Sequence, residues 1–331
     1  MISGHGDDTY SYDGIRSDFS SNICPNPNLQ VLARHLSART DLLSHYPEPE
    51  AWSLERLIAE VHGISPEEVV VTAGATEAIY LTAQTFDLEA LIDEPTFSEY
   101  SDACAMFRGI GEPAPHRGRM AGTMRWICCP NNPTGSVAAE EEIERAANDH
   151  DIVVLDLSYR LYTDCRLITP QRICAMPGVI GIHSMTKTYG VPGLRLGYIT
   201  TNRTLTAMLR RRMRPWSVSP IAIEAGKYLL AHPEMRCRPD LSEAQRLRAR
   251  LIATGAVSVA PTATTFMLCT TDGRCTAAEL KHLLATRHHL LIRDASNFRG
   301  LSSYHFRLAT QTPPENDALV DALCQVLDLK G

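Results

Sequence analysis

The sequence predicts an α/β fold with a large domain built on a mostly parallel sheet and a smaller α+β domain. Short runs that are apolar at every position recur along the first two thirds of the chain, with helical patterns between several of them. Such runs are typical of strands buried on both faces of a parallel sheet. After residue 203 long helices and a few short strands follow, which indicates the second, smaller unit.

The expected elements follow the chain in order. Residues 1 to about 50 are rich in Gly, Ser, Asn, Asp and Pro and predict an extended arm with one short helix near 29–43. Helical periodicity over 52–61 ends at Gly63. The expected strands of the large domain lie at 69–71, 90–92, 126–129, 152–157, 179–183 and 197–200. In the smaller unit we expect helices at 205–212, 221–232 and 242–254, strands at 265–268, 290–293 and 304–309, and a final helix from 316.

Composition narrows the class of protein. The 331 residues are 44% hydrophobic and 21% charged, as in an ordinary globular protein, and carry a net charge of −6. This charge argues against nucleic acid or an anionic membrane surface as a partner. The polar N-terminus shows no signal-peptide pattern and no apolar run reaches the length of a membrane span, so we expect a cytoplasmic protein. The 10 cysteines lack zinc-ligand spacing, and we expect neither a metal site nor a disulfide framework.

The segment 184–198 carries the most specific chemical signal. Lys187 follows the hydroxyl residues Ser184 and Thr186, a glycine-rich turn comes next, and Arg195 lies eight residues after the lysine. A surface position is the ordinary fate of a lysine. Here hydroxyls, an arginine and free backbone N–H groups offer a phosphate site, and a lysine in an apolar, cationic setting has an amine free to attack a carbonyl. The segment therefore predicts the lysine anchor of pyridoxal 5'-phosphate (PLP).

Asp156 and Tyr159 follow the apolar run at 152–157, at the strand end where ligands bind in open α/β sheets. A helix N-cap or a structural ion pair is one explanation for this aspartate. The other is functional, because a carboxylate against the pyridine nitrogen of PLP keeps the ring protonated and makes it an electron sink. Tyr159 either fills the core or hydrogen-bonds the 3'-oxygen of the cofactor.

Two turns offer further cofactor contacts. The sequence Pro-Asn-Asn-Pro-Thr-Gly at 130–135 predicts a turn, and the amide of Asn132 is expected against the 3'-oxygen of the cofactor. Gly74, Ala75 and Thr76 separate a strand from a helix, and the N–H groups at a helix N-terminus suit a phosphate. The chain has no GxGxxG or GxxxxGK[ST] motif, so nucleotide-binding interpretations of these turns lack support.

One aromatic residue and three arginines complete the candidate set. Phe97 either belongs to the core or stacks on the flat cofactor ring. Arg307 lies in an apolar strand and therefore needs an anionic partner. Arg293 is a further candidate for binding an anion, since the arginine fork matches carboxylate and phosphate. Arg299 is expected on a solvated, salt-bridging face.

Taken together, these motifs resemble those of the fold-type I PLP enzymes, the aspartate aminotransferase superfamily. The resemblance covers nearly the whole chain and keeps the family's order: the turn at 74–76, the aromatic residue at 97, NNPTG at 131–135, DLSY at 156–159, SMTK at 184–187, Arg195 and Arg307. Within that superfamily the chain is similar to the branch of the histidinol-phosphate aminotransferases and the L-threonine-O-3-phosphate decarboxylases.

Both ends of the chain resemble decarboxylase patterns. These are the N-terminal His5-Gly6, DFSSNICP at 18–25, and RDASNFRGL at 293–301. Three positions depart from the family pattern: Asp7 stands where the family has glycine, Cys24 where it has asparagine, and Arg299 where it has proline. The span between Tyr100 and Asn131 is also short for the family.

The resemblance implies an architecture and a set of roles. It implies a seven-stranded sheet in a large domain at 46–202, with the arm at 1–45 and residues 203–331 contributing the small domain. It also implies a homodimer with shared active sites, in which Tyr46 reaches the cofactor phosphate of the neighbouring subunit. The catalytic residues are then Lys187, Asp156 and Tyr159. The cofactor-binding residues are Gly74, Ala75, Thr76, Phe97, Asn132, Asp156, Tyr159, Ser184, Thr186, Lys187, Arg195 and Tyr46, and the substrate-binding residues are His5, Asn22, Asn132, Arg293 and Arg307.

The expected reaction is PLP-dependent decarboxylation of L-threonine O-3-phosphate to (R)-1-aminopropan-2-yl phosphate, a step of cobalamin biosynthesis. The same catalytic residues would serve a histidinol-phosphate aminotransferase, which is the alternative enzyme. A PLP-binding sensor module is the alternative outside enzymes. Regulators that carry such a module need a DNA-binding domain ahead of it, which this sequence does not show.

Overall fold

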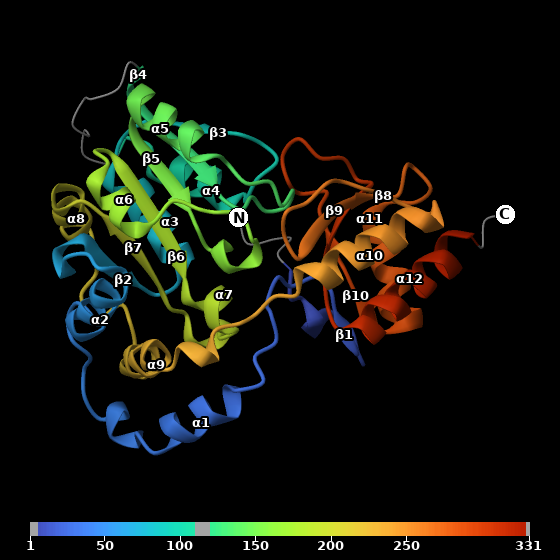
Figure 1. Ribbon diagram of the computed structural model, residues 1–331, viewed down its shortest axis with the longest axis horizontal. Helices are drawn as coiled ribbons and strands as arrows, with labels where there is room; N and C mark the ends of the chain where they lie inside the picture. The colour runs from blue at the N-terminus through green and yellow to red at the C-terminus, as the bar shows by residue number, and fades with distance from the viewer. Residues whose placement is uncertain (1–5, 110–119, 329–331) are drawn as a thin grey trace.

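Apolar strands and the helices between them form a large domain around one six-stranded sheet in the computed structural model, which describes residues 6–109 and 120–328 (Figure 1). The strand order is β2-β7-β6-β5-β4-β3, in which β6, β5, β4 and β3 are parallel and β7 runs antiparallel to both its neighbours. The strands are β2 (Val69–Thr72), β3 (Glu89–Ile92), β4 (Met120–Cys128), β5 (His150–Asp156), β6 (Val179–Ser184) and β7 (Gly197–Thr201).

Six strands, not the expected seven, form this sheet in the described residues. The connection from α4 (Glu99–Phe107) to β4 is short, and residues 110–119 within it lie outside the described residues. The expectation came from the family resemblance, whereas the sequence itself has six apolar runs in this region. Those six runs all form strands of the sheet.

Helices cover both faces of the large sheet because its side chains alternate between two apolar cores. Val70, Ile180 and Ile199 face the core shared with α3 (Ala75–Thr85), α4 and α8 (Arg203–Arg210). On the opposite face, Val71 and Val153 face cores built with four other helices. These are α2 (Trp52–His62), α5 (Glu140–Asp149), α6 (Pro170–Ala175) and α9 (Pro220–Ala231).

The smaller unit is an antiparallel four-stranded sheet in the order β11-β12-β9-β8. The strands are β8 (Ser258–Val259), β9 (Phe266–Thr270), β11 (Arg293–Asp294) and β12 (His305–Ala309), and the helices are α10 (Leu241–Thr254), α11 (Ala277–Leu283) and α12 (Pro313–Asp328). The N-terminal arm joins this unit, because β1 (Ser17–Asp18) pairs with β10 (Leu290–Leu291) and Phe19 lies in its core.

The small domain was expected to begin at residue 203, but α8 and α9 pack against the large sheet. Leu205 and Leu209 of α8 and Ala225 and Leu229 of α9 all lie in large-domain cores. The helical pattern that begins after residue 203 therefore belongs to the last helices of the large domain. The helices that pack in the core of the small domain start with α10. The arm helix α1 (Leu29–Ser37) also packs against α9.

The topology brings several strand ends to one edge of the large sheet. Cys128, Asp156 and Ser184 are the last residues of three parallel strands. The antiparallel β7 begins at the same edge with Gly197, which pairs with Ser184. The small domain faces this edge across the arm (Figure 1). Among the described residues, each helix is too short or too polar to cross a lipid bilayer.

Candidate active site

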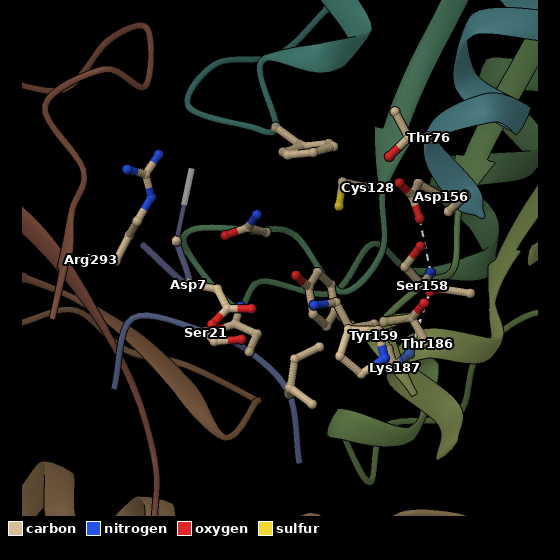
Figure 2. Close-up of a pocket in the computed structure, with 18 of the residues that line it drawn as sticks. Asp7, Ser21, Thr76, Cys128, Asp156, Ser158, Tyr159, Thr186, Lys187 and Arg293 are labelled. Carbon is tan, nitrogen blue, oxygen red and sulfur yellow. Dashed lines mark hydrogen bonds between the residues drawn. The ribbon is translucent and has the colours of Figure 1, made fainter. Parts of the chain in front are cut away.

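A cavity of about 320 Å³ lies at this edge of the sheet, between the two domains. Figure 2 shows Lys187, Tyr159 and Asp156 on its large-domain side and Arg293 on its small-domain side. The predicted site residues that line the cavity are Asn22, Ala75, Thr76, Phe97, Asn132, Asp156, Tyr159, Ser184, Thr186, Lys187, Arg195, Arg293 and Arg307. The structure thus brings together residues from the arm, the large domain and the small domain.

Lys187 lies on the short helix α7 (Met185–Tyr189), which starts directly after β6. Its Nζ lies 5.6 Å from the centre of the Tyr159 ring. Burial and the guanidinium of Arg307 lower the pKa of Lys187 to about 7, although the carboxylate of Asp7 opposes the shift. A substantial fraction of the amine is therefore uncharged near neutral pH, and the uncharged amine is the nucleophilic form.

Asp156 is buried at the end of β5 and is held by two hydrogen bonds. The Tyr100 hydroxyl donates to Oδ2 at 2.7 Å, and the Ser158 backbone N–H donates to Oδ1 at 2.9 Å. Burial raises the pKa of Asp156, and both hydrogen bonds oppose that shift. A carboxylate fixed in this way suits a protonated ring nitrogen as its partner.

The turn before α3 is shaped for a close approach. Gly74 has φ +89°, which favours glycine, and a Cβ there would lie 2.9 Å from Nη2 of Arg195. A Cβ at Gly197 would lie 2.7 Å from the backbone N of Ala75. The N-terminus of α3 and the Arg195 guanidinium therefore meet at one corner of the cavity, with Thr76 beside them. This corner has the groups that bind a phosphate.

Asn132 and Arg307 connect the two domains inside the cavity. Arg307 Nη1 donates to Asn132 Oδ1 at 2.5 Å, and its Nη2 donates to the backbone oxygen of Ser20 at 2.6 Å. Both side chains are buried, and burial lowers the pKa of Arg307. This contact leaves the amide Nδ2 of Asn132 to donate to a ligand. Arg307 is also stacked near the Phe266 ring, with 5.9 Å between Cζ and the ring centre.

Arg293 and Arg307 are direct neighbours on adjacent strands, β11 and β12. Arg293 Nη2 donates to Asn297 Oδ1 at 2.8 Å, and its guanidinium lies 5.5 Å from the centre of the Phe298 ring. Burial and the neighbouring Arg307 lower the pKa of Arg293 to about 10. Within the part of the chain that the structure describes, neither arginine forms an ion pair with an acidic side chain. Two buried guanidinium groups in one cavity therefore call for anionic ligands.

The two aromatic candidates lie on the cavity wall. Phe97 is half-buried and meets Tyr100 edge-on, with 5.8 Å between the ring centres. Tyr159 packs edge-on against Phe266 at 5.0 Å, and burial raises its pKa to about 12. Each residue thus packs against the protein core and also faces the cavity, so the two explanations offered by the sequence are compatible.

Among the described residues, Tyr46 and Gly74 are predicted site residues that do not line this cavity, although Gly74 directly precedes Ala75 at its phosphate corner. Tyr46 is 84% exposed and lies against Trp216, with 5.4 Å between the ring centres. A residue that serves the neighbouring subunit is expected to be exposed in a single chain. His5 lies outside the described residues, as the arm is described from Gly6 onward.

Several cavity residues were missed in the sequence. Tyr100 stands three positions after Phe97 in the same motif, but nothing local showed that its hydroxyl reaches Asp156. Cys128 ends an apolar strand as Asp156 does, and this shared position was the signal that could have found it. Asp7 was noted as a departure from the family, yet its place in the cavity depends on the path of the arm. The other missed residues are Gly6, Ser20, Ser21, Ile23, Ile79, Ser98, Ser158, Pro192 and Phe298.

The donor groups of the cavity fit PLP. Both polar side-chain atoms of the buried Asn22 lack a hydrogen-bond partner in the described part of the chain, and so does Nε of Arg307. The cradle at Gly74 fits a phosphate, Asp156 fits a pyridine nitrogen, and the uncharged amine of Lys187 fits an aldehyde. These residues would hold the three chemically distinct ends of the cofactor.

Comparisons with known proteins agree with this site. Residues 17–323 match the family model described as aminotransferase class I and II. The chain is 26% identical to a threonine-phosphate decarboxylase from Salmonella typhimurium, over 94% of this chain and 91% of that protein. It is also 26% identical to a histidinol-phosphate aminotransferase from Mannheimia succiniciproducens, over 94% and 90% of the two chains. Among solved structures, L-threonine-O-3-phosphate decarboxylase from Porphyromonas gingivalis matches with a TM-score of 0.86 and 33% identity, covering 95% of this chain and all of that one.

The family match covers most of the chain, and the solved relative has the same fold over nearly its whole length. The fold class expected from the sequence is confirmed, as are the family and its cofactor. The chain therefore belongs to the class I and II aminotransferase family of fold-type I enzymes, and its cofactor is pyridoxal 5'-phosphate.

Proposed function

We propose that this enzyme decarboxylates L-threonine O-3-phosphate to (R)-1-aminopropan-2-yl phosphate, a reaction of cobalamin biosynthesis. The observation that carries the proposal is the arginine pair on β11 and β12. Arg293 and Arg307 are adjacent and buried, and both lack an acidic partner among the described residues. Threonine phosphate has a carboxylate and a phosphate on one small molecule, and two arginines suit these two groups.

The comparisons support the same choice. Two curated relatives, one of each activity, are equally similar, at 26% identity. The solved decarboxylase from Porphyromonas gingivalis is more similar, at 33% identity over almost the whole chain. The motifs DFSSNICP and RDASNFRGL, which resemble decarboxylase patterns, lie on the arm and next to Arg293, where the substrate would bind.

We assign the two arginines by their distance from the cofactor residues. Arg307 contacts Asn132 and lowers the pKa of Lys187, so it lies near the reacting carbon and takes the carboxylate. Arg293 lies on the small-domain side of the cavity and takes the phosphate (Figure 2). A substrate held at both ends cannot rotate freely, so its carboxylate is fixed relative to the ring plane. The bond that stands perpendicular to that plane is the bond that breaks.

The chemistry combines one contribution from the cofactor with several from the chain. PLP, when bound, withdraws the electron pair that departing CO2 leaves on the α-carbon. Asp156, which is kept in place by Tyr100 and Ser158, would hold its negative charge against the ring nitrogen. Lys187, whose pKa is about 7, can hold the proton that the α-carbon takes up after CO2 leaves. Phe97, Tyr159 and Phe298 line the cavity and exclude water.

The direct experiment is an assay of the purified holoenzyme with two substrates. With L-threonine O-3-phosphate we expect release of CO2 and formation of aminopropanol phosphate. The control substrate, L-threonine without phosphate, should react far more slowly because Arg293 has no anion to bind. Rapid turnover of histidinol phosphate with 2-oxoglutarate, without CO2 release from threonine phosphate, would replace the decarboxylase with the aminotransferase.

A further inference from the structure

Two cysteines far apart in sequence meet where the N-terminal strap, residues 18–26, crosses the connection between α9 and α10. The Cys237 thiol donates to the backbone oxygen of Cys24 at 3.4 Å, and it also hydrogen-bonds the Cys24 sulfur. Gly190 makes room for this contact. A Cβ there would lie 2.6 Å from the Cys24 oxygen and 3.3 Å from the Cys237 sulfur.

The two thiols differ in how reagents reach them. Cys24 is half-buried and lines a second cavity of about 300 Å³, whose rim includes the exposed residues Arg238 and Thr312. Cys237 is buried behind it, at 7% exposure. A small reagent therefore meets Cys24 first, and Cys237 is placed to attack whatever forms on the Cys24 sulfur.

The two thiols also differ in reactivity. The hydrogen bond from Cys237 lowers the pKa of Cys24 to about 7, while the same contact and burial raise the pKa of Cys237. The thiolate is the form that attacks disulfides. Cys24 thus has the thiolate character of an attacking cysteine, and Cys237 has the position of a resolving one.

We propose that Cys24 and Cys237 form a thiol modification site that reacts with low-molecular-weight disulfides. In the first step the Cys24 thiolate attacks one sulfur of the reagent, forms a mixed disulfide and releases one thiolate. In the second step Cys237 loses its proton to that thiolate or to solvent and attacks the Cys24 sulfur. The second reagent thiol leaves, so two protein thiols are oxidised to a disulfide and one reagent disulfide is reduced to two thiols.

The site is connected to the active site through the strap. The Cys24 backbone N–H donates to the Tyr162 hydroxyl at 3.1 Å, and that hydroxyl donates to the Asn22 oxygen at 3.1 Å. Asn22 lines both cavities, and Arg307 donates to the oxygen of Ser20 on the same strap. The Tyr162 hydroxyl also lies 3.4 Å from the backbone oxygen of Lys187, so the strap is linked to α7 as well. A covalent link at Cys24 is therefore expected to act first on the strap at the substrate side of the active site, while the hydrogen bonds that hold Asp156, from Tyr100 and Ser158, do not involve the strap. We expect a higher KM and an unchanged cofactor absorbance.

The experiment treats the reduced holoenzyme with glutathione disulfide and maps its peptides by mass spectrometry. We expect a peptide pair joined through Cys24 and Cys237, reversed by dithiothreitol. In Cys237→Ala the reaction should stop at glutathione on Cys24 and run about threefold slower at pH 7. The Cys24 pKa returns toward its ordinary value of about 8.5, and the smaller fraction of thiolate outweighs its higher nucleophilicity. The matched control is Cys165→Ser, which removes an exposed cysteine outside the cavity and should still form the joined pair.

Two results would overturn the proposal. One is glutathione on Cys165 with no modification of Cys24. The other is a Cys237→Ala variant whose Cys24 reacts at the rate of the unchanged protein. If an enzyme fully converted to the Cys24–Cys237 disulfide kept an unaltered KM, the proposed connection to the active site would be wrong. Because the peptide map needs no turnover, these outcomes are separate from the success or failure of the proposed reaction.

Discussion

The reactivity of Lys187 is set by residues that lie far from it in the sequence. Ser184 and Thr186 identified the lysine, but Arg307 on the small domain is the main charge that lowers its pKa. The carboxylate of Asp7, on the arm, acts in the opposite direction. The local motif therefore identifies the residue, and the assembled fold determines its protonation.

The opposing effect of Asp7 gives a prediction about pH. Replacing Asp7 with Asn removes a negative charge near Lys187, so the Lys187 pKa falls below about 7. The uncharged amine that captures PLP then persists at lower pH. We expect the pH midpoint for the rate of PLP uptake by the apoenzyme, followed by visible absorbance, to move downward. Asp8→Asn, which removes the neighbouring charge paired with Lys281, should leave the midpoint in place. An upward shift in Asp7→Asn would contradict the argument.

Tyr100 provides a second prediction at this scale. Tyr100→Phe removes the hydroxyl that donates to the buried carboxylate of Asp156. A hydrogen bond to a charged group is worth about 1.5–3 kcal/mol, so we expect kcat/KM to fall about tenfold or more. Steady-state kinetics measure the loss. The control is Tyr80→Phe, which removes a hydroxyl that donates to Glu99 at 2.7 Å outside the cavity. Equal losses in both variants would show that Asp156 does not depend on Tyr100.

Sequence analysis found the residues whose role depends on a local motif and missed those that act over distance. Asn132 and Arg195 stand in recognisable segments, and both line the cavity. Tyr100 was missed because its partner is 56 positions away and no periodicity connects the two. Asp7 was noticed only as an unusual residue. Its position in the cavity follows from the path of the whole arm.

At the scale of elements, the apolar runs predicted which segments form strands, but they did not predict where each strand begins and ends. The six strands of the large sheet were expected, but β4 begins at Met120, six residues before the expected start at 126. Its first residues are exposed or polar, so they lack the apolar signal. The pairing of the two-residue strands β1 and β10 could not be predicted from the sequence either. Pairing between the arm and residue 290 is a tertiary contact that leaves no local pattern.

The helix α7 and the strap give a prediction about glycine. Gly190 ends α7 with φ +64°, and a Cβ there would lie 2.6 Å from the Cys24 oxygen. Gly190→Ala should therefore lower the free energy of unfolding by about 1 kcal/mol or more, measured by urea denaturation. Gly193 is the matched control, because nothing lies within 4 Å of a Cβ at that position. Gly193→Ala is expected to change stability by less than about 0.5 kcal/mol, and an equal loss in both variants would refute the steric argument.

At the scale of the whole molecule, Tyr46 lies on the surface of the described chain and not in the cavity. Tyr46 and Trp216 pack together, and Leu43 is 72% exposed in the segment that leads to them. Trp52 is also an exposed large apolar side chain in this part of the chain. Exposed apolar groups that gather in this way are typical of a surface that binds another protein. Together with the resemblance, this surface supports a homodimer in which each subunit supplies Tyr46 to the other.

Subunit exchange tests this arrangement. Lys187→Ala should be inactive because its own site lacks the lysine, and Tyr46→Ala should bind PLP weakly because each site lacks the tyrosine supplied by its partner. In a mixed dimer, the site that keeps Lys187 receives Tyr46 from the Lys187→Ala subunit and is complete. Equal mixing after dissociation and reassociation should restore about a quarter of the activity of the unchanged enzyme, since half of the dimers carry one complete site of two. If Tyr46 served its own subunit, the mixture would contain no complete site beyond those of the separate variants, and activity would stay at the average of the two.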